Sequence, residues 1–91
     1  MKNNKRIKHL MDIVTYKRKT YYISTNDTPD HGLETMIFKC KRKIKNIEEL
    51  KEVNFEAVNW CELYAETYET VNEAIKKHYE IVENLKEYIE R

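Results

Sequence analysis

Residues 70–90 carry the pattern that constrains this chain most, because it specifies both the start of a helix and the face that the helix buries. Thr70 and Glu73 match the T-x-x-E capping box, in which each side chain bonds the backbone N–H of the other residue. Beyond this start, apolar side chains recur every three or four residues. The recurring positions are Val71, Ile75, His78, Val82, Leu85 and Ile89, widened by Ala74, Ile81 and Tyr88. The pattern predicts a long C-terminal helix packed across a small sheet.

The spacing of this stripe also allows a second arrangement. Its steps alternate between four and three residues, as in a helix–helix seam. A homodimer through residues 70–90 is therefore the alternative to packing within the chain. Packing on the chain's own sheet is favoured, because the stripe is short for a coiled coil and broad on the helix surface.

Two segments upstream have the composition of strands that pair as a hairpin. Residues 20–25 and 34–40 are rich in β-branched and aromatic side chains, which favour strands. Residues 26–32 contain Pro29, Gly32 and several Asn and Asp, which are typical of turns. We therefore expect a hairpin whose loop covers residues 26–32.

Residues 57–64 alternate in the manner of a third strand. One face of that strand would carry Val58, Trp60, Glu62 and Tyr64. A helix is the alternative there, because short apolar runs fit both periodicities. Residues 46–53 predict a short helical turn.

The N-terminal segment fits two structures. A helical stripe over residues 4–15 consists of Ile7, Leu10, Met11 and Val14. Residues 13–16 are β-branched and aromatic, which favours a strand instead. Of the two, a short N-terminal helix is the prediction.

Together these patterns predict a single α+β domain over residues 1–91. A basic segment covers residues 1–19, a sheet region covers 20–64, and the C-terminal helix covers 70–90. We expect a small, mostly antiparallel, three-stranded sheet. No apolar run reaches the roughly 20 residues that cross a bilayer, and the N-terminus lacks the apolar region of a signal peptide. A cytoplasmic protein with no membrane partner is expected.

Charge is divided between the two halves of the chain. Residues 1–45 hold 12 Lys and Arg against 4 Asp and Glu, whereas residues 46–91 hold 5 against 12. The halves thus carry net charges of +8 and −7, although the whole chain carries only +1. This asymmetry indicates a two-faced molecule, provided that the halves occupy separate surfaces.

The positive half contains two basic clusters. One precedes the first expected strand and the other follows the second. Their members are Lys17, Arg18 and Lys19, and Lys41, Arg42 and Lys43 with Lys45. If the two strands pair antiparallel, both clusters fall at the same end of the sheet, where they could hold phosphate or an acidic protein surface. Solvated turns are the more ordinary explanation.

Seven Tyr against two Phe is an unusual ratio that suits half-buried surfaces. Trp60, Tyr64 and Tyr68 form an aromatic group beside acidic residues, which would suit a partner rich in Arg or Lys. Burial in the core is the favoured explanation for Trp60, because so small a domain needs its largest apolar side chain inside.

One loop offers donors for a divalent cation, namely Asp27, Asp30, His31 and Glu34. Their spacing matches no metal motif, and each has a role in turn chemistry. We therefore expect no metal and no other cofactor.

His78 is the one His on the apolar stripe, where a hydrogen-bonded core histidine is commoner than a catalytic one. An enzyme that used His31 and His78 is the minority hypothesis, so we expect no catalysis. Cys40 and Cys61 form no CxxC pair and are expected to be small buried residues.

Several short motifs between residues 20 and 85 together give the chain a resemblance to a family. They are Ser24-Thr25, Thr28-Pro29-Asp30 with Gly32, Glu34-Thr35-Met36-Ile37-Phe38, Trp60-Cys61-Glu62-Leu63-Tyr64, Tyr68-Glu69-Thr70-Val71-Asn72-Glu73-Ala74 and His78-Tyr79-Glu80-Ile81-Val82. In these motifs the chain resembles a group of small uncharacterised proteins of bacteriophages and prophages. Residues 41–55, where the family usually has a simpler turn, and the basic N-terminal segment depart from its pattern. The resemblance implies an origin in a mobile element and carries no function to transfer.

Small phage proteins without catalytic motifs often bind and block a host component. With the divided charge, this resemblance makes a non-enzymatic inhibitor of a host protein or ribonucleoprotein the leading hypothesis, for instance an anti-CRISPR, counter-defence protein that acts on a CRISPR effector in the host cytoplasm. Acidic side chains would imitate nucleic-acid phosphates: Glu62, Glu66, Glu69, Glu80, Glu83 and Glu87. The alternative is a nucleic-acid- or nucleotide-binding accessory protein that uses the two basic clusters.

Overall fold

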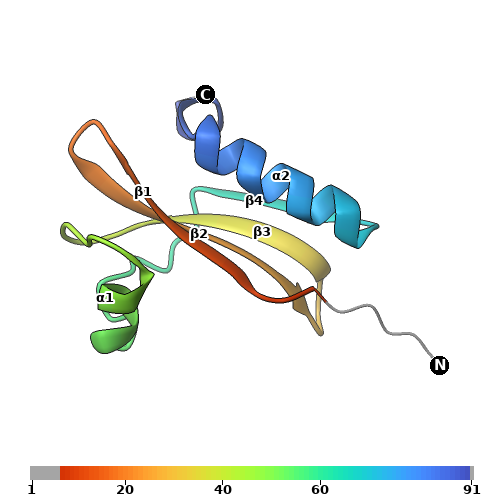
Figure 1. The fold of residues 1–91 in the computed structure, drawn as a ribbon, viewed down its shortest axis with the longest axis horizontal. Coiled ribbons are helices and arrows are strands. Elements are labelled where there is room, and N and C mark those ends of the chain that lie inside the picture. Colours follow the sequence, from red (N-terminus) through yellow and green to blue (C-terminus); the bar gives the residue numbers. More distant parts are fainter. Residues whose placement is uncertain (1–6, 91) are drawn as a thin grey trace.

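The computed structural model describes residues 7–90, which form an antiparallel sheet in which each strand pairs with the next along the chain (Figure 1). The strands are β1 Leu10–Tyr16, β2 Lys19–Thr28, β3 Gly32–Lys39 and β4 Tyr64–Tyr68. The helices are α1 Ile47–Glu52, α2 Val71–Glu83 and α3 Lys86–Ile89. The α+β class and the antiparallel sheet agree with the sequence, but the sheet has four strands rather than three.

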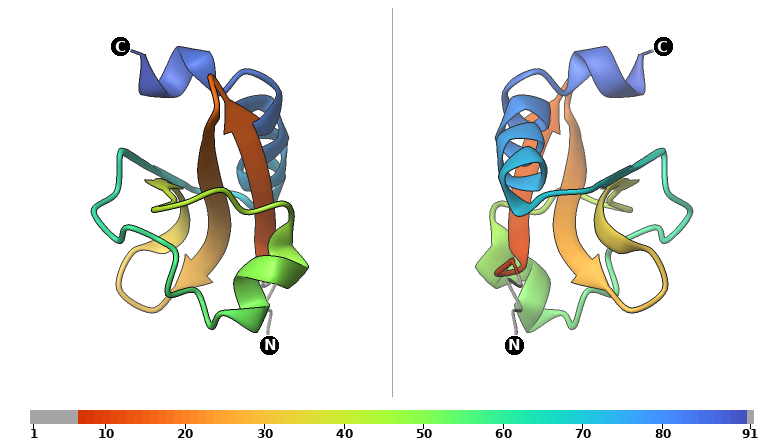
Figure 2. Two further views of the ribbon diagram at one scale, coloured as in Figure 1. Left: turned by 90° about the vertical axis from the view of Figure 1, so that its left-hand side faces the viewer. Right: turned by 90° about the vertical axis from the view of Figure 1, so that its right-hand side faces the viewer.

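Alternating side chains on β2 and β3 produce an apolar core on each face of the sheet. Figure 2 shows α1 on one face of the sheet and α2 on the other. The face beneath α2 and α3 buries Tyr21, Ile23, Ile37, Ile81, Leu85 and Tyr88. The opposite face, covered by α1 and the loop that follows it, buries Tyr22, Phe38, Cys40, Ile44, Leu50, Ala57 and Val58. Each fully buried Ile or Leu among them stabilises the fold by about 1.5–3 kcal/mol. The sheet is therefore the middle of three layers.

The expected N-terminal helix is wrong, because residues 10–16 form β1. Met11 and Ile13 pack toward the α1 face, while Val14 and Tyr16 pack toward the α2 face. Side chains therefore alternate between the two faces, as a strand requires. Over so short a segment, apolar side chains on both faces also fit the spacing of a helix. Pairing with β2 decides between the two, since the ladder runs along the whole segment and bonds the backbone groups that face β2.

The hairpin between β2 and β3 is confirmed, but both strands are longer than expected. Thr28 pairs with Gly32, so the loop contains only residues 29–31. Gly32 has a φ of 72°, a backbone conformation that glycine adopts without steric cost. The expected helical turn is also confirmed as α1, and the Asn46 side chain caps it by accepting the Glu49 N–H at 2.9 Å.

The strand predicted for residues 57–64 lies further along the chain in the structure, where it is β4. Residues 57–63 form a loop with one isolated bridge, between Val58 and Cys40, and the strand begins only at Tyr64. The Asn59 side chain accepts the Cys61 N–H at 3.1 Å, a local bond that competes with ladder pairing. The strand prediction is therefore wrong for residues 57–63.

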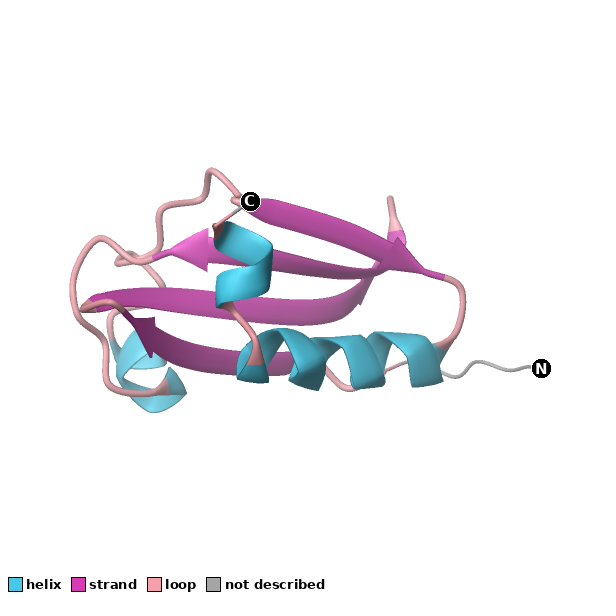
Figure 3. Cartoon of the chain, turned by 90° about the horizontal axis from the view of Figure 1, so that it is seen from above, coloured by secondary structure: helices cyan, strands magenta, loops and turns pink. Residues whose placement is uncertain are grey.

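The C-terminal helix begins where the capping box predicts. Thr70 Oγ1 accepts the Glu73 N–H at 3.1 Å, and Glu73 Oε1 accepts the Thr70 N–H at 3.2 Å. A single helix to residue 90 is wrong, because Asn84 leaves the helical conformation and its side chain donates to the Glu80 carbonyl at 3.0 Å. The chain then turns into α3, which lies across the direction of α2 (Figure 3) and buries Tyr88. Within residues 7–90, no helix is long and apolar enough to cross a membrane.

Candidate functional site

The two basic clusters meet at one end of the sheet. Antiparallel pairing brings the start of β2 beside the end of β3, and the Cys40 N–H donates to the Thr20 carbonyl at 2.8 Å there. A depression of about 230 Å³ lies at this point. Its lining consists of Arg18, Lys19, Thr20, Lys39, Cys40, Lys41, Arg42 and Lys43. We call the cationic members of this set, together with Lys17 in the adjoining turn, the basic end.

Few carboxylates neutralise the basic end. Arg42 pairs with Glu56 at 3.1 Å, and Lys17 pairs with Glu90 at 2.9 Å. The hydrogen bond and charge of Glu90 raise the pKa of Lys17, and those of Lys17 lower the pKa of Glu90. The remaining members make no ion pair with any residue in 7–90: Arg18, Lys19, Lys39, Lys41 and Lys43. Five cations thus remain available to an anionic ligand.

The turn between β1 and β2, which carries part of the basic end, has a backbone conformation that its two residues adopt unfavourably. Lys17 and Arg18 join β1 to β2 with φ of 51° and 67°, so both are left-handed. Two such residues form the turn that best matches the twist of a hairpin, and Asn-Gly is its favoured sequence. Lys and Arg fit this conformation poorly, because their Cβ atoms approach the backbone too closely. Local folding preference therefore does not explain two cations at this turn.

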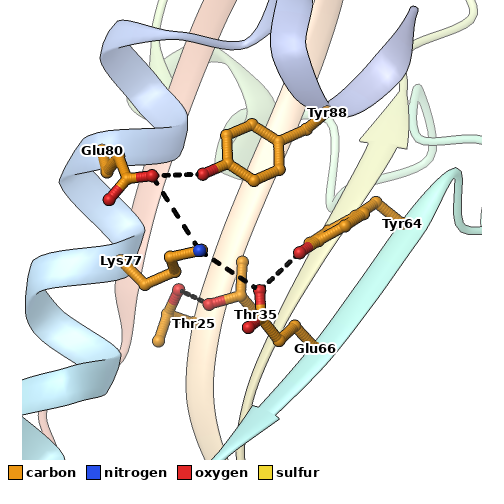
Figure 4. A network of polar contacts seen from close by, with 7 residues as sticks. All are labelled: Thr25, Thr35, Tyr64, Glu66, Lys77, Glu80 and Tyr88. Carbon is orange, nitrogen blue, oxygen red and sulfur yellow. Dashed lines mark hydrogen bonds and ion pairs between the residues drawn. The ribbon is translucent and has the colours of Figure 1, made fainter. Parts of the chain in front are cut away.

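A second polar group lies between β4 and α2 (Figure 4). Lys77 Nζ lies 3.9 Å from a carboxylate oxygen of both Glu66 and Glu80. Tyr64 donates a short hydrogen bond to Glu66, and Tyr88 donates to Glu80 at 2.5 Å. Burial, followed by the bond to Glu66, raises the pKa of Tyr64. One ammonium group thus lies between two carboxylates that also accept tyrosine hydroxyls.

The Tyr68 hydroxyl is buried beside this group and makes no hydrogen bond of normal geometry with residues 7–90. Burial raises its pKa to about 12, although the neighbouring Thr35 hydroxyl opposes the rise. A shallow hollow of about 210 Å³ lies alongside. Its lining consists of Glu66, Tyr68, Glu73, Lys76, Lys77 and Glu80. Because both charges are present there, the hollow has no strong preference for an anion or a cation.

The six predicted acidic residues do not lie on one helix. Glu66 and Glu80 flank Lys77, as described above. The other four are exposed on four different segments, which are the loop before β4, the connection to α2, the end of α2, and α3. They are Glu62, Glu69, Glu83 and Glu87.

The sheet separates the predicted aromatic group. Tyr64 and Tyr68 pair with Ile37 and Leu33 and lie beneath α2. Trp60 lies on the other face, with its ring 5.0 Å from that of Phe38 in an edge-on contact. The residue is 57% exposed, so the expectation that Trp60 belongs to the core is wrong.

His78 is fully buried in a network of polar side chains. Its Nδ1 lies 2.7 Å from Thr25 Oγ1, and its Nε2 lies 2.7 Å from Asp12 Oδ2. Thr25 Oγ1 in turn lies 2.6 Å from Thr35 Oγ1. Three of the motifs that carry the family resemblance, those with Thr25, Thr35 and His78, therefore meet at one point.

The order of hydroxyl, imidazole and carboxylate in this network matches that of a hydrolase triad. Thr25 is fully buried, however, and its hydroxyl also contacts Thr35, so no substrate atom reaches it in this structure. The arrangement therefore joins α2 to β1 and β2 rather than presenting a nucleophile. Of these residues, only His78 was a predicted site residue. The Ser24-Thr25 and Glu34-Thr35 motifs could have identified the two threonines, whereas Asp12 lies in none of the motifs.

The four predicted donors in and beside the loop between β2 and β3 do not form a metal site. His31 Nδ1 lies 3.9 Å from a Glu34 oxygen, while Asp27 and Asp30 contribute to no cation-binding group. Residues 7–90 hold no group of three or more His, Cys, Asp or Glu side chains placed for a metal ion. Cys40 is buried as expected, and burial raises its pKa, whereas the expectation of burial is wrong for Cys61, which is exposed.

Among the arrangements described, the basic end combines exposure with unbalanced charge of one sign. The His78 network is closed to solvent at Thr25, and the group around Lys77 contains both charges. The comparisons with protein-family models, curated proteins and solved structures found no match to this chain.

Proposed function

We propose that this protein is a non-enzymatic binding protein that holds the phosphate backbone of a nucleic acid at its basic end. The observation that carries the proposal is the convergence of two basic clusters, distant in sequence, around one depression. Phosphate contacts made by Lys and Arg supply most of the affinity in sequence-independent recognition. A nearly neutral chain thereby presents a surface whose local charge is strongly positive.

The proposal makes a quantitative statement about salt. If the five unpaired cations each contact one phosphate, the slope of log K against log salt is about −3.5 for a single strand and about −4.5 for a duplex. Binding should therefore weaken steeply as salt is raised. A slope near zero would contradict the proposal, because it would mean that no counterions are released.

The test is fluorescence anisotropy of labelled oligonucleotides titrated with the protein across a range of salt concentrations. Lys41→Glu with Lys43→Glu should abolish binding at moderate salt. Lys51→Glu with Lys76→Glu is the matched control, because it makes the same change in net charge at two exposed positions, on α1 and α2, outside the basic end. Equal losses in the two variants would show that net charge, and not the basic end, governs binding.

The inhibitor hypothesis remains a second proposal. It is supported by the resemblance and by the exposure of Glu83 and Glu87, neither of which pairs with a cation in residues 7–90. A host ribonucleoprotein, such as a CRISPR effector, would also present RNA phosphates to the basic end. The two surfaces can be separated in a pull-down from host lysate with nuclease treatment. If the variant Glu83→Lys with Glu87→Lys no longer retains a protein complex, the result favours mimicry of phosphates by the acidic residues. If only the variant Lys41→Glu with Lys43→Glu loses the complex, the result favours binding through the basic end.

A further inference from the structure

We infer that the nucleic acid held at the basic end is single-stranded and that a base stacks on Trp60. This inference rests on the proposed function and specifies its ligand. Single-strand binding surfaces combine a cationic path for the backbone with aromatic rings on which bases stack. A duplex, whose bases are already stacked on one another, offers no such partner to an exposed ring except at its ends.

Trp60 is fixed at the margin of the basic end by its backbone. The Asn59 N–H donates to the Lys39 carbonyl at 2.9 Å, and the Lys41 N–H donates to the Ala57 carbonyl at 2.6 Å. These bonds hold residues 57–59 one strand spacing, about 4.8 Å, from the end of β3. The residue next to this segment is therefore adjacent to the chain that carries Lys39 and Lys41.

The ring of Trp60 is held in place but not covered. It makes edge-on contacts with Phe38, at 5.0 Å between ring centroids, and with Tyr22, at 6.4 Å. Despite these contacts, 57% of the residue is exposed. Leu63, three residues later, is 49% exposed. An immobilised, exposed indole loses little conformational entropy when a base stacks on it.

The path from the ring to the cations passes around the end of β3. Trp60 lies on the α1 face, whereas Lys39 pairs with Tyr21 and points to the α2 face. Lys41, Arg42 and Lys43 continue around the end of β3 in the loop beyond it. A flexible single strand can curve around the end of β3 and contact both Trp60 and these cations, which a stiff duplex of the same length cannot do.

The chain contains a single Trp, so its fluorescence reports on this site alone. The first experiment is a titration of the unmodified protein with an unlabelled oligothymidylate of about 12 nucleotides, within the usual site sizes for single strands. Stacking should quench the fluorescence in proportion to binding. The second compares labelled oligothymidylate with a duplex of equal length by anisotropy, and the single strand should bind more tightly.

Variants then separate stacking from folding. Trp60→Ala should weaken single-strand binding at least about fivefold, and Trp60→Phe, which keeps an aromatic face, should retain most of the affinity. Tyr79→Ala is the matched control, because Tyr79 is 47% exposed on α2 and should have no effect. Circular dichroism of each variant shows whether the fold is retained.

Two failures remain distinguishable. Salt-dependent binding with unchanged fluorescence, an unaffected Trp60→Ala variant or a preference for the duplex would overturn this inference and leave the basic end as a phosphate-binding surface. Absence of binding to either form at low salt would overturn the proposed function as well.

Discussion

His78 Nε2 lies 2.7 Å from Asp12 Oδ2, and this contact ties α2 to the edge strand β1 across 66 residues of sequence. The imidazole is fully buried, and its other nitrogen contacts Thr25, so both ring nitrogens have partners. Burying a polar side chain costs free energy unless its polar atoms are hydrogen-bonded, as both ring nitrogens are here. The network therefore stabilises the placement of α2 over the sheet.

Replacing His78 by Ala should lower the free energy of unfolding by about 2–4 kcal/mol, because it leaves a cavity and removes one of the two partners of the buried Thr25 hydroxyl. Asp12→Asn should cost less, since the Asp12 side chain is 40% exposed and its charge is screened by solvent. Urea denaturation followed by circular dichroism measures both. Lys76→Ala, at an exposed position on α2, is the control, and an equal loss there would mean that His78 has no special role.

The Tyr68 hydroxyl leads to a prediction about alkaline pH. Because its pKa is raised from 10 to about 12, the neutral phenol contributes stability that is fully present below pH 10 and is lost as the pH rises toward 12. Tyr64, whose pKa is also raised, adds to the same loss. Urea midpoints measured between pH 8 and about pH 11 should therefore fall in the wild type.

Tyr68→Phe tests this prediction by removing the titrating hydroxyl. The variant should be at least as stable as the wild type at pH 7, because the hydroxyl it loses has no normal hydrogen bond within residues 7–90. Its alkaline loss of stability should be smaller. A variant that is clearly less stable at pH 7 would show that Tyr68 makes a hydrogen bond that matters in solution.

Arg18→Gly should raise the stability of the fold and weaken nucleic-acid binding at the same time. Arg18 has a φ of 67°, and relief of this conformation should exceed the entropy cost of Gly by about 0.5–1 kcal/mol. The same change removes an unpaired cation from the basic end. Thermal melts and anisotropy titrations measure the two effects. A more stable variant with unchanged affinity would show that Arg18 does not contact the nucleic acid.

Thr70→Ala should cost about 1 kcal/mol through loss of the cap on α2. Thr70 Oγ1 accepts the Glu73 N–H at 3.1 Å, and Ala leaves that donor to solvent. Thr67→Ala, at an exposed position on β4, is the matched control. If both variants unfold at the same urea concentration as the wild type, the capping box contributes nothing measurable.

Local chemistry made several elements predictable. The capping box placed the start of α2 at Thr70, the pattern of residues 46–53 indicated α1, and Pro29 with Gly32 placed the β2–β3 turn. These signals act between residues a few positions apart, so they do not depend on the rest of the fold. The meeting of the basic clusters also followed from the sequence, because antiparallel strands bring the start of one beside the end of the next.

Contacts between distant segments decided the rest. Residues 10–16 fit a helix or a strand, and pairing with β2 selects the strand. Trp60 has the large apolar side chain of a core residue, yet the loop bonded to β3 holds it at the surface. Nothing in the sequence indicates that Asp12 and His78 are in contact, because the contact forms only when α2 packs across the sheet. Short periodic patterns and single side chains are ambiguous in isolation, since hydrophobic burial depends on which surfaces the folded chain brings together.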